Sequence, residues 1–283
     1  MSEEKTVKLE NEYVEATVSE KAAEVISFKR KDNGIEMIWC RDPAYWYNCN
    51  PILFPYYSKL KDGRYEIDGR TIEMGQHGFA RRAWFRFTRV ERERCELELS
   101  DDEDTWALYP FHFTLKVRYQ LEGCRIVISY QIINRDRRDL PFNIGFHPAF
   151  NCPFTPDRKY EDYRIEFEKC EDLRHPEKPH LTSGSSFSLC DTLVDGSYFY
   201  ENSQIKSNWC QLTDGVHTLR VGIEGYQILG FWKKSTDTPF ICIEPWRPVC
   251  DLRQARTFRD DVDNNLLPPN QQFECSYYFE IVS

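Results

Sequence analysis

Short runs in which apolar and polar residues alternate one by one recur along this chain. Clear examples are 95–99, Cys-Glu-Leu-Glu-Leu, and 163–168, Tyr-Arg-Ile-Glu-Phe-Glu. A period of two places the apolar side chains on one face of an extended strand. No long stretch has the period of an amphipathic helix. The sequence therefore predicts an all-β protein whose strands each bury one face.

Turn-forming dipeptides separate several of these runs. Asn33-Gly34 lies between 25–30 and 35–39, and Asp68-Gly69 divides 65–72. Both dipeptides favour tight hairpin turns, and type I′ is the expected form at Asn33-Gly34. We therefore expect antiparallel hairpins, with 35–39 as the return strand of the first.

The number of such runs suggests one large unit. About sixteen or more short strands are expected, and the 283 residues contain no internal repeat, linker or low-complexity segment. We predict a single domain over residues 1–283, built as a large antiparallel β-sandwich.

Neither the acidic nor the cysteine residues predict a metal site. Residues 101–105 have the spacing of a cation loop but lack the glycine and distal glutamate of an EF-hand, which favours a solvated connection. The 11 cysteines include no C-x-x-C pair, which removes support for a zinc ribbon or thioredoxin motif. Cys40, Cys242 and Cys250 lie in or beside apolar runs and are predicted to be buried, reduced thiols.

Charge and hydropathy limit the classes of partner that this chain is expected to bind. The net charge of −9 disfavours a nucleic-acid surface, which would carry a basic face. The N-terminus is polar, no signal peptide is visible and no apolar run reaches membrane-spanning length, so a cytoplasmic protein without a membrane partner is expected. Aromatic residues make up 15% of the chain; most should fill the core, but flat rings also suit the C–H faces of a sugar.

A histidine lies at the end of an apolar run in 143–151, Asn-Ile-Gly-Phe-His-Pro-Ala-Phe-Asn. Pro148 restricts His147 to extended backbone and should end the strand there. Gly145 removes side-chain bulk one pleat earlier, so that something could approach closely. For an isolated histidine, a hydrogen-bonded place in a β core is the alternative interpretation.

Two further stretches also place a proton-transferring residue beside an apolar run. These are 76–81, Gln-His-Gly-Phe-Ala-Arg, and 243–246, Ile-Glu-Pro-Trp. Glu244 follows the apolar strand 240–243, which should partly desolvate its carboxyl group and raise its pKa. A salt bridge to Arg247 or Arg81 is the structural alternative for this glutamate.

Together these stretches resemble the aldose 1-epimerase (galactose mutarotase) family, and in particular its bacterial mutarotase-like branch. The resemblance covers essentially the whole chain. Each motif alone is weak, but their order along the chain is specific. The motifs are 50–55 (Asn-Pro-Ile-Leu-Phe-Pro), 76–81, 109–111 (Tyr-Pro-Phe), 145–151 and 244–246.

The family implies a galactose mutarotase-like supersandwich that interconverts the α and β anomers of a free aldose. By this resemblance Glu244 is the base, His147 is the acid and His77 binds the sugar. Asp195 matches the sugar-binding aspartate best, with Asp191 as the alternative.

The remaining site residues are less closely defined by the resemblance. Relatives often have Gly-Arg where this chain has Ser58-Lys59, and Lys59 could replace the charge of that arginine but not its fork. Arg81 could bind a hydroxyl or orient a carboxylate. Trp246 and Trp46 are candidate stacking platforms, with core packing as the alternative. Phe146 replaces a glycine found in many relatives and should point away from His147.

Anomerisation requires two proton transfers and no redox change, so no cofactor is implied. A carboxylate and an imidazole on opposite sides of the ring would suffice. We expect no metal, although a site between His77 and His147 is a minor alternative.

Other functions remain open at this point. One is a mutarotase for a phosphorylated sugar, with Lys59, Arg81 and Arg82 as candidate cations. Another is a carbohydrate-binding protein of the same fold without turnover. A hydrolase or lyase is disfavoured, because hydrolysis would need two carboxylates and Glu244 is the one convincing candidate. A small-molecule sugar is the expected partner, and the protein is expected to be a monomer or homodimer.

Overall fold

The computed structural model describes residues 4–57, 59–172, 183–189, 196–201, 205–226, 228–235, 237–247 and 265–283. In this part of the chain there are 22 strands, one α-helix and three 3-10 helices. Neighbouring strands pair antiparallel in both large sheets, so the all-β prediction is confirmed. Among the described residues, no helix has the length and apolarity needed to cross a membrane.

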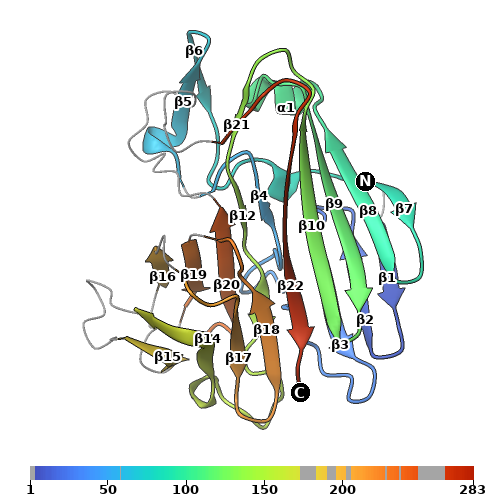
Figure 1. Cartoon of the computed structure of the whole chain (residues 1–283), viewed down its shortest axis with the longest axis vertical. Coiled ribbons are helices and arrows are strands. Elements are labelled where there is room, and N and C mark those ends of the chain that lie inside the picture. Colours follow the sequence, from blue (N-terminus) through green and yellow to red (C-terminus); the bar gives the residue numbers. More distant parts are fainter. Residues whose placement is uncertain are drawn as a thin grey trace.

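The larger sheet has nine strands in the order β15-β14-β17-β18-β22-β10-β9-β8-β7 (Figure 1). Its centre is the pairing of three ten-residue strands, β9, β10 and β22. The strands are β7 (Arg86–Val90), β8 (Arg94–Ser100), β9 (Phe113–Glu122), β10 (Arg125–Asn134), β14 (Arg164–Asp172), β15 (Ser183–Ser188), β17 (Trp209–Thr213), β18 (Thr218–Gly222) and β22 (Gln272–Ile281).

The second sheet has six strands, in the order β16-β19-β20-β12-β4 with β13 also paired to β20. The central strand β20 thus receives two consecutive short strands, β12 and β13, along one edge. The bounds are β4 (Ile52–Leu53), β12 (Ile144–Phe146), β13 (Ala149–Asn151), β16 (Gly196–Glu201), β19 (Ile228–Lys233) and β20 (Phe240–Arg247).

Smaller elements complete the fold. A three-stranded sheet and two pairs of strands accompany the two large sheets. They are β1 (Thr6–Glu10), β2 (Val14–Ser19) and β3 (Val25–Arg30); β5 (Arg64–Ile67) with β6 (Arg70–Glu73); and β11 (Leu140–Phe142) with β21 (Asn265–Leu267). The helices are α1 (Glu103–Leu108) and the 3-10 turns Lys61–Gly63, Ala80–Arg82 and Tyr160–Asp162.

Aromatic rings fill the space between the two large sheets. Phe146 on β12 stacks on Tyr130 of β10 and Tyr277 of β22, with ring centroids 4.3 and 4.5 Å apart. Phe150 on β13 meets Phe279 edge to face at 4.9 Å. These contacts show two sheets packed face to face. They also confirm that Phe146 points into the core, away from His147.

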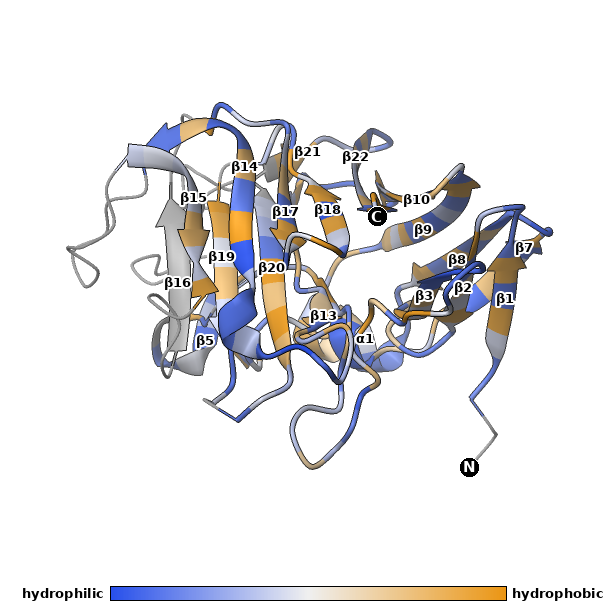
Figure 2. Ribbon diagram, turned by 90° about the horizontal axis from the view of Figure 1, so that it is seen from below, coloured by the Kyte–Doolittle hydropathy of each residue, from blue (hydrophilic) through white to orange (hydrophobic). Residues whose placement is uncertain are grey.

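Alternation along the strands sets which side faces this core. Along β10 every second side chain is buried, and Figure 2 shows hydrophobic and hydrophilic residues alternating along β14. By contrast, β19 and β20 are buried on both faces. The six-stranded sheet is therefore covered on its outer side as well, and that outer side carries the candidate site.

One predicted hairpin is confirmed and one is wrong. Asp68 and Gly69 have φ angles of 50° and 73°, as a type I′ turn requires. At the other hairpin Gly34 has a positive φ but Asn33 does not, and 35–39 forms isolated bridges instead of a strand. The carboxylate of Glu36 accepts from the backbone N–H groups of residues 28 and 38, at 2.7 and 3.0 Å, in place of a regular ladder.

The acidic segment 101–105 is not a plain loop. Asp102 caps α1 by accepting from Thr105 N at 2.8 Å, and Asp101 accepts from Phe113 N at 3.0 Å. Residues 102–104 are exposed, as the predicted solvated connection requires, but the segment also begins a capped helix.

Two of the three cysteines predicted to be buried lie in the part of the chain that the structure describes. Cys242 is buried, as expected, but Cys40 is exposed. Cys40 follows the irregular segment 35–39, so no strand carries it into the core. Cys250 lies outside the described residues.

Candidate active site

The stretch around His147 leaves the six-stranded sheet just before the histidine. Strand β12 ends at Phe146, because Pro148 has no N–H with which to continue a ladder. The backbone N–H of His147 instead donates to Pro51 O at 3.2 Å, and Ala149 N donates to Cys49 O at 2.6 Å. These bonds tie the histidine to the chain segment that leads into β4.

Glu244 lies within β20, not after it as the sequence suggested. Its register partner on β19 is Gly230, which contributes no side chain beside the carboxylate. Cys242 and Trp246 lie two residues away on either side, so the three side chains share one face of the strand. Phe231 on β19, offset by one residue, packs between the sheets against Phe187 at 5.2 Å. Glu244 therefore faces the outer side of the six-stranded sheet.

His147 and Glu244 meet on this outer side. His147 Nε2 lies 3.3 Å from Glu244 Oε1, and the side chains are only 9% and 1% exposed. Neither carboxylate oxygen of Glu244 has a hydrogen-bond partner, and His147 Nδ1 has none either. The sequence analysis put the two groups on opposite sides of a sugar ring. Their contact means instead that both can reach the same edge of a bound molecule.

His77 completes this group through an unusual backbone. Its φ of +68° and that of Gly78, +69°, are both left-handed. A Cβ on residue 78 would lie 2.1 Å from Phe54 O, which accepts from Phe79 N at 3.1 Å. Only glycine fits there. The histidine carries its strain at the site, as residues in ligand clamps often do.

The ring of His77 lies beside that of His147, with centroids 5.7 Å apart. The side-chain amide nitrogen of Gln76 donates to His77 Nε2 at 3.0 Å, which places the ring proton on Nδ1. Burial lowers the pKa of His77 to about 3, and the cations Arg81 and Lys59 add to this effect. His77 is therefore a neutral hydrogen-bonding group at physiological pH.

Aromatic rings surround His147 and His77. Trp46 lies 5.0 Å and Trp232 5.2 Å from the His147 ring, centroid to centroid. Trp246 packs on Tyr57 at 4.7 Å and lies 6.1 Å from His77.

Gly145 was expected to permit a close approach, and it does so for a side chain of the protein itself. A Cβ there would lie 2.8 Å from the Trp246 ring. The Trp246 N–H donates to Phe146 O at 3.2 Å, so this ring is held firmly over the glycine.

Burial controls the proton equilibria of the pair. It raises the pKa of Glu244 well above its usual range, and Arg81 and the N–H of Trp246, whose hydrogen bond goes to Phe146 O, offset only part of this effect. It lowers the pKa of His147 well below its usual range, with His77 and Arg81 acting in the same direction. Both shifts favour the uncharged forms, protonated Glu244 and neutral His147, so the pair holds one proton, which either group can carry in turn.

Two of the predicted cations, Arg81 and Lys59, lie near enough to His77 to lower its pKa. Arg81 is partly buried, and its Nε is buried without a hydrogen-bond partner. Among the described side chains it forms no ion pair with Glu244, so that structural alternative for the glutamate is not supported. Lys59 is exposed. Asp195 and its alternative Asp191 lie outside the described residues.

Several residues of this site were not predicted from the sequence. Trp232 and Gly230 on β19 flank the pair, and Cys242 joins His147 and Glu244 in a buried group that could hold a metal ion. The spacing Cys242-x-Glu244-x-Trp246 could have identified one face of a strand if the strand had been extended to Arg247.

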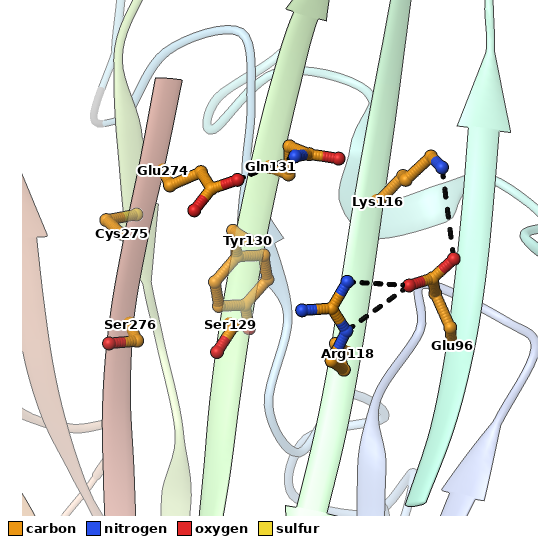
Figure 3. Close-up of a pocket in the computed structure, with 9 residues that line it drawn as sticks. All are labelled: Glu96, Lys116, Arg118, Ser129, Tyr130, Gln131, Glu274, Cys275 and Ser276. Carbon is orange, nitrogen blue, oxygen red and sulfur yellow. Dashed lines mark hydrogen bonds and ion pairs between the residues drawn. The ribbon is translucent and has the colours of Figure 1, made fainter. Parts of the chain in front are cut away.

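A separate hollow of about 210 Å³ lies on the outer face of the nine-stranded sheet. Figure 3 shows Arg118 and Lys116 on β9 turned toward Glu96 on β8, at 3.0 and 3.9 Å. Gln131 donates to Glu274 at 2.6 Å. In this hollow Glu96 is paired with Lys116 and Arg118, and Glu274 accepts from Gln131, whereas the Glu244 carboxylate accepts no hydrogen bond.

The fold and this site define a class: an antiparallel β-sandwich with a buried carboxylate–imidazole pair on the outer side of one sheet. A family model described as Aldose 1-epimerase matches residues 5–192. The chain therefore belongs to the aldose 1-epimerase family.

Similar proteins agree with this membership and with the fold. Protein LacX, chromosomal, of Lactococcus lactis subsp. lactis is 31% identical, covering 98% of this chain and 100% of LacX. A galactose mutarotase related enzyme from Lactobacillus acidophilus has a TM-score of 0.87 at 25% identity, covering 99% of this chain and 98% of that one. A galactose mutarotase-like protein from Lactobacillus casei ATCC 334 has a TM-score of 0.86 at 25% identity, covering 98% and 100%. The predicted resemblance and galactose mutarotase-like supersandwich are thereby confirmed.

Proposed function

We propose that this protein is an aldose 1-epimerase that interconverts the α and β anomers of a free hexose. The observation that supports this most is the buried contact of His147 Nε2 with Glu244 Oε1 at 3.3 Å, in which both carboxylate oxygens remain without hydrogen bonds. A fold does not leave a buried carboxylate unpartnered without a compensating role. A sugar hydroxyl would supply the missing donor.

The pair can perform the reaction with one proton. The pKa shifts favour the proton on Glu244, and its transfer to His147 Nε2 across the 3.3 Å contact gives the reactive form. In that form the Glu244 carboxylate takes the proton of the anomeric hydroxyl while His147 gives its own to the ring oxygen. The C1–O5 bond breaks, the free aldehyde forms and C1 rotates. On closure the C5 hydroxyl attacks either face of the aldehyde, His147 takes back its proton and Glu244 returns one to the anomeric oxygen. Each group acts once as acid and once as base.

The contact between the two groups suits this sequence. The anomeric oxygen and the ring oxygen are both bonded to C1, so they lie on one edge of the sugar. A carboxylate and an imidazole that touch each other can address both oxygens from that side. The reaction is redox-neutral, and these two side chains supply all its proton transfers without a cofactor.

The surrounding residues would hold the sugar. Neutral His77 would donate from Nδ1 to a hydroxyl group. Trp246 and Trp46 offer flat apolar surfaces for C–H groups. Arg81 and Lys59 would bind hydroxyl or anionic groups on the His77 side. Asp195 stays a prediction from the family resemblance.

The approach of fresh α-D-glucose and α-D-galactose to anomeric equilibrium, followed by polarimetry, tests this function. Wild type should accelerate the approach and Glu244→Gln should not. Glu224→Gln, which removes a charge at an exposed position, is the matched control and should keep the wild-type rate. Wild-type turnover by Glu244→Gln would contradict the assigned base.

A phosphorylated sugar is the second candidate substrate. Arg81 and Lys59 both lower the pKa of His77, so positive charge gathers at that side of the site. If a hexose phosphate is the substrate, its rate should exceed that of the free hexose and Lys59→Ala should remove the difference. Equal loss with both sugars would contradict a phosphate contact at Lys59.

A further inference from the structure

Three buried side chains of the metal-binding type gather on the outer side of β20. One ligand atom each from His147, Cys242 and Glu244 lies within 4.8 Å of the others. Two of them come from alternate positions of one strand, and the third comes from the chain that follows β12. The acid/base mechanism uses His147 and Glu244 but gives no role to Cys242.

The side chains of this cluster carry several atoms that can donate an electron pair to a metal, and most of these atoms have no hydrogen-bond partner in the protein. Both oxygens of Glu244 and Nδ1 of His147 are buried without hydrogen bonds. Arg81 acts on Glu244 from beyond ion-pair distance. The Cys242 sulfur lies within 4.8 Å of a Glu244 oxygen, and among the described side chains no Lys or Arg forms an ion pair with Glu244.

We propose that His147, Cys242 and Glu244 form a binding site for a borderline-soft divalent cation, Zn²⁺ in particular. An imidazole nitrogen, a thiolate and a carboxylate oxygen are the three ligand types that Zn²⁺ takes in proteins, whereas Mg²⁺ and Ca²⁺ prefer oxygen alone. At Zn²⁺ bond lengths of about 2.0–2.3 Å, tetrahedral ligand atoms lie roughly 3.3–3.8 Å apart. The His147–Glu244 distance of 3.3 Å already fits, and a side-chain shift of about 1 Å would bring Cys242 within range.

Charge balance favours the exchange of protons for metal. On binding, the Cys242 thiol loses its proton and the His147–Glu244 pair loses the proton that it shares. One dication thus replaces two protons, and the net charge of the buried site does not change. The fourth coordination position stays open for water or for a hydroxyl group of a ligand.

Such a site would regulate the proposed epimerase. This part of the inference rests on the proposed function: a metal bound to Glu244 and His147 removes both proton-transfer groups, so Zn²⁺ should inhibit and sugar should compete with it. Direct metal binding needs no turnover and can be measured separately.

Cobalt titration tests the binding site itself. We would use the full chain with the exposed thiols removed by Cys40→Ser and Cys170→Ser. One equivalent of Co²⁺ should give the near-ultraviolet thiolate-to-cobalt band and the strong visible bands of a tetrahedral site. Adding Cys242→Ser should abolish the near-ultraviolet band. Adding Cys210→Ser, at a buried cysteine of β17, should leave the spectrum unchanged.

Two results would overturn the proposal: no thiolate band in the parent protein, or a band that persists in Cys242→Ser. Thermal unfolding of each variant shows that it is folded, and Cys242→Ala provides a second variant if the serine is not tolerated.

The inhibition arm uses Zn²⁺ and mutarotation. The effect of Zn²⁺ on each variant is expressed relative to its own rate without Zn²⁺. Cys242→Ser should need at least about tenfold more Zn²⁺ for half-inhibition than the parent protein, because loss of even an outer partner of a metal site weakens binding by this much. A cobalt band without any mutarotation would refute the proposed function and leave the metal site standing. Mutarotation without a thiolate-to-cobalt band from Cys242 would refute the metal site and leave the proposed function standing.

Discussion

Two buried glutamates of this protein lie in opposite kinds of surroundings. Glu171 on β14 is fully buried and accepts from Lys206 N, Ser207 N and Ser207 Oγ at 2.9, 2.7 and 2.7 Å. Glu244 on β20 is 1% exposed, and neither of its oxygens accepts a hydrogen bond. The Glu171 carboxylate stabilises the fold, because it accepts hydrogen bonds from two backbone N–H groups of a loop. The Glu244 carboxylate accepts no hydrogen bond from the protein, as expected of a group that binds a ligand.

A third buried carboxylate, that of Glu24, helps to hold the backbone next to His147, the partner of Glu244. Glu24 accepts from Cys49 N and Asn50 N at 3.0 and 3.1 Å and lies 3.6 Å from Arg41. Cys49 O in turn accepts from Ala149 N, two residues beyond His147. Satisfied polar groups thus fix the backbone that presents the unsatisfied pair.

The largest expected effect is on activity, at Glu244. Glu244→Gln should lower the rate of mutarotation by about 10²–10⁴-fold, the usual contribution of a general acid or base. Its free energy of unfolding should stay equal or rise, because the folded protein no longer bears a buried acid. Polarimetry and urea unfolding measure the two effects. A loss of stability with a normal rate would make Glu244 a structural residue.

The next effect is on stability, at Glu171. Glu171→Ala should lower the free energy of unfolding by roughly 3 kcal/mol, since each orphaned buried donor costs about 1–3 kcal/mol. The rate per folded molecule should not change. The urea midpoint measures this. Glu171→Gln keeps an acceptor oxygen and should lose less, so equal losses in both variants would contradict the hydrogen-bond explanation.

The pH dependence of stability separates Glu244 from ordinary carboxylates. Its folded-state pKa is raised by burial, so above the pKa of the unfolded chain, about 4.3, the folded state holds a proton that the unfolded state has lost. This contribution to stability therefore falls as the pH rises toward the folded pKa. The stability of Glu244→Gln relative to wild type should grow over the same range. A constant difference between the two would contradict the raised pKa.

The pH dependence of activity tests the shared proton. The lowered pKa of His147 and the raised pKa of Glu244 keep one proton on the pair, so kcat/KM should be flat through neutral pH after subtraction of the uncatalysed rate. A rise or fall centred near 6.5, the value of an exposed histidine, would contradict the coupled pair.

The smallest effect is expected at His77. His77→Asn should lower kcat/KM roughly 3–10-fold, the value of one neutral hydrogen bond, mainly through KM. Asparagine tolerates the left-handed φ of +68° at this position, so stability should change little. His77→Val removes the same hydrogen bond but should also destabilise the fold. If both variants were equally stable, backbone strain at His77 would be excluded.

The sequence could predict the sheets better than the site. Alternation in 95–99 and 163–168 marks strands because it depends on local burial alone: β8 contains 95–99, and β14 contains 164–168. The segment 35–39 failed because a side chain, Glu36, took the donors of the ladder. Side-chain competition of this kind leaves no mark on the alternation.

For the site, the motifs were sufficient to name His147, Glu244 and His77, which the structure brings together. They could not show Trp232 beside them, because that contact depends on the register between β19 and β20. The two proton-transfer groups are neighbours because β12 and β13, on either side of His147, both pair with β20, and local patterns could not reveal this pairing.

One paired measurement tests the central claim most directly: mutarotation rate and urea midpoint for Glu244→Gln and Glu171→Gln, each compared with wild type. Both variants replace a buried carboxyl group by an amide of the same shape. Glu244→Gln should lose the mutarotation rate and keep the wild-type urea midpoint. Glu171→Gln should keep the mutarotation rate and have a lower urea midpoint. If Glu244→Gln keeps its rate, the pair with His147 does not carry the reaction.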